Sequence, residues 1–153
     1  MIKLNFIEKL LGSGIYTGYI PFASGTFGTL AALAIYLIPG FENPYVIIPA
    51  IVFFFIYGVY VGNKFEKFYG KDPSECTIDE VVGTWISYLL LPKAIGIIVI
   101  TFFLWRALDI FKPYPARKLE YLNGGLGIMI DDVVSGFYTL IIMHLVVYFF
   151  GIF

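Results

Sequence analysis

The chain has 153 residues, of which 59% are hydrophobic and only 14% are charged. Its mean hydropathy of +0.86 is too high for a soluble domain of this size, which excludes a water-soluble enzyme with a mainly polar surface. The composition predicts an all-α, multi-pass helical membrane protein with one domain over residues 1–153. The single cysteine, Cys76, excludes an intramolecular disulfide, so the chain requires no oxidising compartment.

The N-terminal residues mix charged side chains, Lys3, Glu8 and Lys9, with leucine, isoleucine and phenylalanine. This mixture is typical of a surface helix. The segment lacks the uninterrupted apolar run and the small-residue cleavage site of a signal peptide.

Five apolar stretches follow, and prolines separate most of them. They lie at residues 27–38, 45–61, 80–91, 94–108 and 133–150. We expect about five membrane helices. The second and fifth stretches approach the ~20 residues that a span requires, whereas the first and third have about 12 and are too short to cross ~30 Å of hydrocarbon unaided. We expect those two to be tilted, extended by interfacial turns or only partly inserted.

The positive charges predict an orientation in the membrane. Nine of the ten lysine and arginine residues lie in the N-terminal segment, in residues 62–75 and in residues 106–118, and Lys93 is the exception. If all five helices cross, a cytoplasmic N-terminus places these three segments on the cytoplasmic side, as the positive-inside rule favours. The same orientation puts the acidic pairs described below on the cytoplasmic side.

The loop before the first apolar stretch, from Tyr19 to Leu30, is rich in proline, glycine, serine and threonine. Its hydroxyl groups and the backbone amides of Gly25 and Thr26 suit an anion bound at a helix N-terminus. The alternative interpretation is that Ser24 or Thr26 is an ordinary N-cap.

Two carboxylates, Asp79 and Glu80, open the third apolar stretch. A helix N-terminus favours negative charge, so dipole complementation with Thr77 as the N-cap explains one such pair by itself. Acidic residues beside apolar membrane sequence also need a cation, and they usually mark function.

At the end of the fourth stretch, Arg106, Asp109 and Lys112 are spaced by three residues and are expected to share one helix face. One interpretation is that Asp109 faces a metal while Arg106 and Lys112 hold a phosphate. The other is an ion-pair ladder that anchors the helix at the membrane interface.

A second acidic pair, Asp131 and Asp132, follows a glycine-rich turn at residues 124–127. Glycines let backbone amides turn toward an anion, and neighbouring carboxylates repel one another unless a cation binds them. Hard oxygen ligands in this arrangement suit Mg²⁺, and no cluster of histidine and cysteine favours a softer metal.

Together these motifs resemble the phosphatidylglycerophosphatase A family over most of the chain, in four segments that occur in this order: residues 21–30, 79–83, 106–115 and 124–132. The resemblance implies Mg²⁺-dependent removal of the terminal phosphate of phosphatidylglycerophosphate, giving phosphatidylglycerol, in the bacterial cytoplasmic membrane. One departure is Ser24, because the family commonly has proline before the Gly-Thr pair.

The resemblance and the motifs define an expected site, in which Mg²⁺ binds a phosphate oxygen and lowers the pKa of an attacking water. The expected catalytic residues are Asp79, Glu80, Asp131 and Asp132. The family's acidic positions, from which the metal ligands would come, match Asp79, Glu80, Asp109, Asp131 and Asp132. The residues expected to neutralise the remaining phosphate oxygens are Gly25, Thr26, Arg106 and Lys112.

The expected partners are the phospholipid substrate and the membrane, with no nucleic acid. The oligomeric state is open, although the spacing of Gly58 and Gly62 permits helix association. Other lipid phosphates would use the same metal chemistry, so the motifs do not fix the headgroup.

The main alternative function is a small cation or phosphate transporter, in which the same carboxylates form an ion path. The lack of inverted repeats counts against it, as does the placement of both acidic pairs on one predicted side. A non-catalytic assembly or lipid-binding subunit is a third alternative, which gives the paired acids no role.

Overall fold

The computed structural model describes residues 3–151, and its regular elements in that range are all helices. This confirms the all-α prediction. The elements are α1 (Phe6–Gly12), the short 3₁₀ helix η1 (Thr17–Tyr19), α2 (Ser24–Tyr36), α3 (Pro44–Tyr69), α4 (Ile78–Ser87), α5 (Ile95–Phe111), α6 (Ala116–Leu119) and α7 (Gly125–Phe150).

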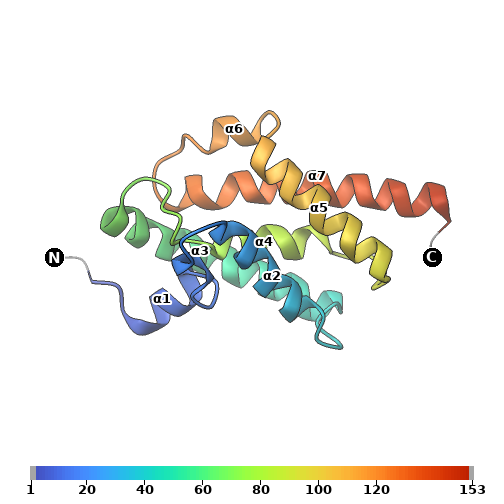
Figure 1. The fold of residues 1–153 in the computed structure, drawn as a ribbon, viewed down its shortest axis with the longest axis horizontal. Coiled ribbons are helices and arrows are strands. Elements are labelled where there is room, and N and C mark those ends of the chain that lie inside the picture. Colours follow the sequence, from blue (N-terminus) through green and yellow to red (C-terminus); the bar gives the residue numbers. More distant parts are fainter. Residues whose placement is uncertain (1–2, 152–153) are drawn as a thin grey trace.

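The two longest helices, α3 and α7, have 26 residues each and are long and apolar enough to cross a membrane. They contain the second and fifth predicted apolar stretches. At 1.5 Å per residue each is about 39 Å long, which exceeds the ~30 Å hydrocarbon core. Figure 1 shows α7 running along the length of the molecule to the C-terminus. These two helices indicate that the protein associates with a membrane.

The remaining predicted membrane helices are shorter. Helix α2 is a shorter apolar helix of 13 residues, and α4 has ten. The chain after α4 stays close to α2, because the hydroxyl of Tyr36 at the end of α2 lies 3.4 Å from the carbonyl oxygen of Leu91. Lys93 then forms a 2.7 Å ion pair with Glu42, so the α2–α3 and α4–α5 loops meet at one end of the bundle. Five crossings of the membrane stay a prediction.

Helix α3 contacts α7 through small residues. A methyl group added at Gly58 would lie 2.4 Å from the sulfur of Met129, and one added at Gly62 would lie 2.8 Å from the Cα atom of Gly125. Because the residue number on α3 rises while that of its contact on α7 falls, the two helices are antiparallel. The spacing of Gly58 and Gly62 therefore serves a contact within the chain.

Helix α4 lies at the centre of the bundle, in contact with α2, α3, α5 and α7. Its side chains Val82 and Trp85 are almost fully buried, and the indole N–H of Trp85 donates a 3.0 Å hydrogen bond to the carbonyl oxygen of Ala32. A ten-residue helix buried on all sides is held by these contacts, since isolated helices this short are marginal.

Helix α1 packs against the C-terminal half of α3, with the side chain of Glu8 directed inward. The carboxylate of Glu8 is buried and pairs with Lys64, while Phe6 and Ile7 are 68% and 58% exposed. Asn5 caps the helix by accepting a 2.8 Å hydrogen bond from the backbone N–H of Glu8. The expected N-terminal surface helix thus forms, with Phe6 and Ile7 on the outside and Leu10 and Leu11 half-buried.

Candidate active site

The two acidic pairs meet because α4 and α7 approach each other at glycines. A methyl group on Gly136 of α7 would lie 2.9 Å from the carbonyl oxygen of Gly83 of α4, and one on Gly83 would lie 3.1 Å from the carbonyl oxygen of Asp132. Only a residue without a side chain permits such an approach. The first turn of α4 therefore lies beside the second turn of α7.

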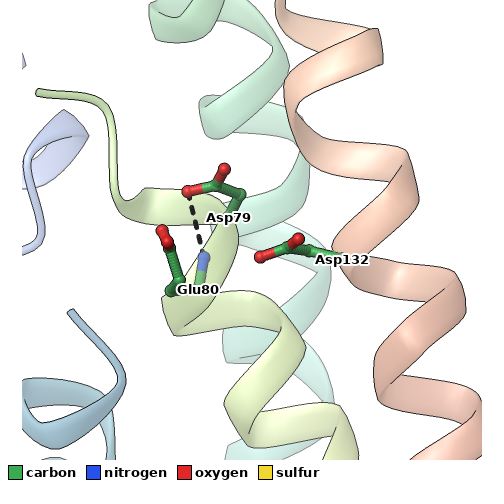
Figure 2. A group of neighbouring side chains, drawn as sticks. All are labelled: Asp79, Glu80 and Asp132. Carbon is green, nitrogen blue, oxygen red and sulfur yellow. Dashed lines mark hydrogen bonds between the residues drawn. The ribbon is translucent and has the colours of Figure 1, made fainter. Parts of the chain in front are cut away.

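Three carboxylates form a cluster at this contact: Asp79, Glu80 and Asp132. Each offers an oxygen atom that lies within 4.8 Å of the others. Figure 2 shows Asp79 and Glu80 on α4 and Asp132 directed toward them from α7. Asp79 and Asp132 are only 8% and 3% exposed. The backbone N–H of Glu80 donates a 3.0 Å hydrogen bond to Asp79.

This cluster fits a divalent cation. Glu80 Oε2 and Asp132 Oδ2 are buried and have no hydrogen-bond partner among the described residues, and buried carboxylate oxygens are costly unless they are paired. Three oxygen ligands with room for water match the preference of Mg²⁺. Burial, and then the charge of Glu80, raise the pKa of the nearby Cys76 thiol.

Asp131 faces a different partner from its neighbour Asp132. Its Oδ2 atom accepts a 2.6 Å hydrogen bond from the ammonium group of Lys112, which also lies 3.4 Å from Glu120. Burial lowers the pKa of Lys112, but the hydrogen bond and charge of Asp131 outweigh it and the net shift is upward. Lys112 is therefore a permanent positive charge beside the carboxylate cluster.

Asp109 also has a cationic partner. Its Oδ2 atom lies 2.7 Å from Nη1 of Arg106, which confirms that these two residues share a helix face. Lys112 is the C-cap residue of α5, with a left-handed backbone at φ of 45°, and it lines one cavity together with Asp109. The same guanidinium contacts the hydroxyl of Thr29 at 3.4 Å, and Nε of Arg106 is buried without a hydrogen-bond partner among the described residues.

The start of α2 closes the site on one side. A methyl group at Gly25 would lie 2.1 Å from Glu80 Oε1 and 3.1 Å from Nη2 of Arg106. Gly25 is thus in contact with both the acidic cluster and the guanidinium. Thr26 is half-buried in the same turn.

The expected capping hydrogen bonds are not formed at α2 or α4. The N-cap of α2 is Ala23, with φ of 48°, and neither Ser24 nor Thr26 caps the helix. Thr77 is the N-cap residue of α4, but its hydroxyl lies 3.1 Å from that of Thr17 and caps nothing. Ordinary capping therefore does not account for these polar residues.

The glycine-rich segment at residues 124–127, expected as a turn, is the N-cap and first residues of α7 and serves packing. Gly124 has φ of 77°, which favours glycine, and the N–H of Gly125 donates a 3.0 Å hydrogen bond to the side chain of Asn63 on α3. The sequence predicted that these backbone amides bind an anion. The N–H of Gly125 is not available for one, because it already donates to Asn63.

A cavity of about 320 Å³ joins the carboxylates and the lysine. The predicted residues that line it are Asp79, Glu80, Asp109, Lys112, Asp131 and Asp132. Asp72, Ser74 and Ser24 also line the cavity. None of the three is among the expected site residues, although Ser24 belongs to the loop whose hydroxyls were expected to suit an anion. The Asp-Pro-Ser turn at 72–74 was the available signal, since such turns fix side chains near a backbone bend.

Comparison with known proteins agrees with the resemblance. The family model of phosphatidylglycerophosphatase A matches residues 10–147. A protein of Bacteroides thetaiotaomicron, provisionally named a phosphatidylinositol-3-phosphatase, is 36% identical over 94% of this chain and 95% of its own. No solved structure matches the chain.

Two further relatives carry the family's name. Phosphatidylglycerophosphatase A of Escherichia coli is 34% identical over 88% of this chain and 80% of its own, and that of Haemophilus influenzae is 34% identical over 91% and 88%. A match along residues 10–147 and these relatives show that the chain belongs to the phosphatidylglycerophosphatase A family and is a lipid phosphatase.

Proposed function

We propose that this enzyme removes the terminal phosphate of phosphatidylglycerophosphate in a Mg²⁺-dependent hydrolysis that yields phosphatidylglycerol. The observation that carries the proposal is the cluster of Asp79, Glu80 and Asp132, whose oxygens lie within 4.8 Å of one another. Two of those oxygens are buried and unpaired within residues 3–151. The choice of substrate rests on the family and on the two relatives named phosphatidylglycerophosphatase A.

In this proposal the five predicted metal ligands divide into two groups. Asp79, Glu80 and Asp132 hold Mg²⁺, which when bound supplies Lewis acidity toward a phosphate oxygen and toward the attacking water. Asp131 and Asp109 instead hold the cations Lys112 and Arg106 in place, as their 2.6 Å and 2.7 Å contacts suggest.

The two cations, Lys112 and Arg106, bind the phosphate beside the acidic cluster. Lys112 lines the cavity with the carboxylates, and Arg106 reaches Gly25 next to Glu80. Positive charges held in place before the reaction stabilise charge on the phosphoryl oxygens without reorganising. Ser24, Gly25 and Thr26 complete the phosphate side of the site, with the Ser24 side chain at the cavity wall.

We place the site on the cytoplasmic side of a multi-pass protein in the bacterial cytoplasmic membrane. Glu42 and Lys93 pair at one end of the bundle, and the other nine basic residues belong to segments that approach the opposite end. The positive-inside rule favours that end as cytoplasmic. The carboxylates at the N-terminus of α4 would then meet headgroups of the inner leaflet.

A second candidate substrate is a phosphoinositide. The Bacteroides relative with 36% identity is named for phosphatidylinositol 3-phosphate, which also carries a phosphate monoester on a diacyl lipid headgroup. The metal and cation arrangement suits either monoester. The transporter alternative has no support from the family or from the relatives' names.

Phosphate release from the two lipids tests the proposal. Purified enzyme in detergent micelles would receive each lipid at equal mole fraction, with Mg²⁺ or with EDTA, beside Asp131→Asn and Asp132→Asn variants. We expect Mg²⁺-dependent release, faster from phosphatidylglycerophosphate and impaired in both variants. Faster release from phosphatidylinositol 3-phosphate would select the second substrate, and release that persists in EDTA would overturn the metal assignment.

A further inference from the structure

An apolar groove of about 340 Å³ lies between α3 and α7, and every side chain that lines it is apolar. Phe55 and Val52 of α3 form one wall, and Val133 and Phe137 of α7 form the other. Val52 and Phe137 are 51% and 48% exposed, so the groove opens to the outside of the molecule.

The groove exists because α3 and α7 separate beyond a close contact. They touch at Gly62 and Gly125 and again at Gly58 and Met129. Phe55 lies one turn before Gly58, and Val133 lies one turn after Met129. The walls thus begin directly beyond the contact, on the side away from the N-terminus of α7.

Helix α4 connects the groove to the acidic cluster. Its residues Val82 and Ile86 line the groove and are 0% and 3% exposed. Asp79, Val82 and Ile86 are spaced by three and four residues, so they share one face of α4. On α7, Val133 directly follows Asp132. The metal-binding end and the apolar groove are therefore successive parts of the same two helices.

The length of α4, from the acidic cluster to beyond Ile86, matches the depth of one leaflet. Helix α4 has ten residues, which is about 15 Å and half of the ~30 Å hydrocarbon core. If the headgroup of a lipid lies at Asp79, its acyl chain would extend over the same depth as α4 and in the same direction.

We propose that this groove binds one acyl chain of the lipid whose phosphate is hydrolysed at the acidic cluster. The inference rests on the proposed function and narrows the substrate class to phosphate monoesters of acylated lipids. Bilayer lipid is as apolar as the groove, so the chain gains little transfer free energy there. The groove acts by position: it fixes the depth and direction of the headgroup relative to the carboxylates.

Filling the groove tests the proposal. Val52→Trp places an indole at the exposed wall, far in sequence from the carboxylates, and Val99→Trp is the matched control because Val99 of α5 is 47% exposed and lies outside the groove. Two substrates would be compared in micelles: dioleoyl phosphatidylglycerophosphate and its deacylated, water-soluble headgroup.

We expect Val52→Trp to lower the ratio of kcat/KM for the diacyl lipid to kcat/KM for the deacylated headgroup by about tenfold, because a displaced headgroup misaligns the phosphate. Val99→Trp should leave the ratio at the wild-type value. An unchanged ratio in Val52→Trp, or an equal fall in both variants, would overturn the proposal that the groove binds an acyl chain. If wild-type enzyme cleaves neither substrate, the proposed function fails instead.

Photocrosslinking tests whether the groove binds an acyl chain without requiring turnover of the lipid. The probe is phosphatidylglycerophosphate with a diazirine on one acyl chain, added to wild-type protein in micelles, and the comparison lipid is diacylglycerol with the same diazirine. We expect label on peptides containing Val52, Ile86 or Phe137, with competition by unlabelled phosphatidylglycerophosphate. Label spread equally over α5, or equal labelling by diacylglycerol, would contradict the proposal.

Discussion

Gly136 of α7 packs against the backbone of Gly83 of α4, where an added methyl group would lie 2.9 Å from the Gly83 carbonyl oxygen and 3.2 Å from Cβ of Ile86. This contact fixes the distance between the two helices that carry the carboxylates. The active site therefore depends on two residues that have no side chain and no chemistry of their own.

Replacing Gly136 by valine should separate α4 from α7 and move Asp132 away from Asp79. We expect Gly136→Val to lose most phosphatase activity and to unfold at a lower temperature in detergent, since overpacking a tight contact costs about 1–3 kcal/mol. The control is Gly96→Ala on α5, where the added methyl group meets no atom within 4 Å. That variant should keep its activity and its unfolding temperature.

Asp132 belongs to the carboxylate cluster and Asp131 pairs with Lys112, so we expect their replacement to have different effects on metal binding. Asp132→Asn should weaken Mn²⁺ binding, measured by electron paramagnetic resonance as a stand-in for Mg²⁺, by about tenfold or more. Asp131→Asn should keep most of that affinity and raise KM for the lipid, because it loosens Lys112. Equal losses of Mn²⁺ affinity would show that both residues are ligands.

Arg106 is expected to need its planar guanidinium and not only its charge. Arg106→Lys keeps the positive charge but loses the planar guanidinium, whose Nη1 contacts Asp109 and Thr29 while Nη2 lies beside Gly25. Loss of a hydrogen bond between charged groups predicts a fall in kcat/KM of about tenfold to hundredfold. Arg117→Lys on α6 is the control, since Arg117 is exposed and should behave as wild type.

The ion pair between the buried Glu8 and the partly exposed Lys64 predicts a pH dependence of stability. Burial raises the pKa of Glu8, but hydrogen bonds from Lys64 and from the backbone of Asn5 outweigh it and hold the pKa below the ordinary value. The stabilisation from Glu8 is then complete above the unfolded pKa of about 4.3 and is lost as the pH falls through the lower folded pKa.

Thermal unfolding of Glu8→Gln beside wild type measures this contribution. We expect the variant to unfold at a lower temperature at neutral pH, and the difference to shrink as the pH falls below about 4.3. Glu66→Gln is the control, because Glu66 forms no ion pair among residues 3–151. A difference that stays constant across this range would show that the charge of Glu8 does not contribute.

The presence of the long helices was predictable from the chain, but their ends were not, because α3 continues to Tyr69 and α7 begins at Gly125. The stretches 45–61 and 133–150 lie within α3 and α7, because a long apolar run leaves the backbone no partner except its own helix in an apolar environment. The stretch 80–91 was less predictable: α4 ends at Ser87, and residues after it are held by tertiary contacts such as that from Tyr36 to Leu91.

The sequence by itself determined that an acidic pair opens α4 and that a second pair lies near the start of another helix, since order along the chain is a local property. It did not fix where that second helix begins, because α7 starts at Gly125 and Asp131 and Asp132 lie in its second turn. The tertiary structure decided which carboxylates act together. Asp131 and Asp132 are adjacent, yet successive residues point about 100° apart around a helix axis. The rotation of α7, held by the contact of Gly136 with Gly83, turns Asp132 toward Asp79 and Asp131 toward Lys112.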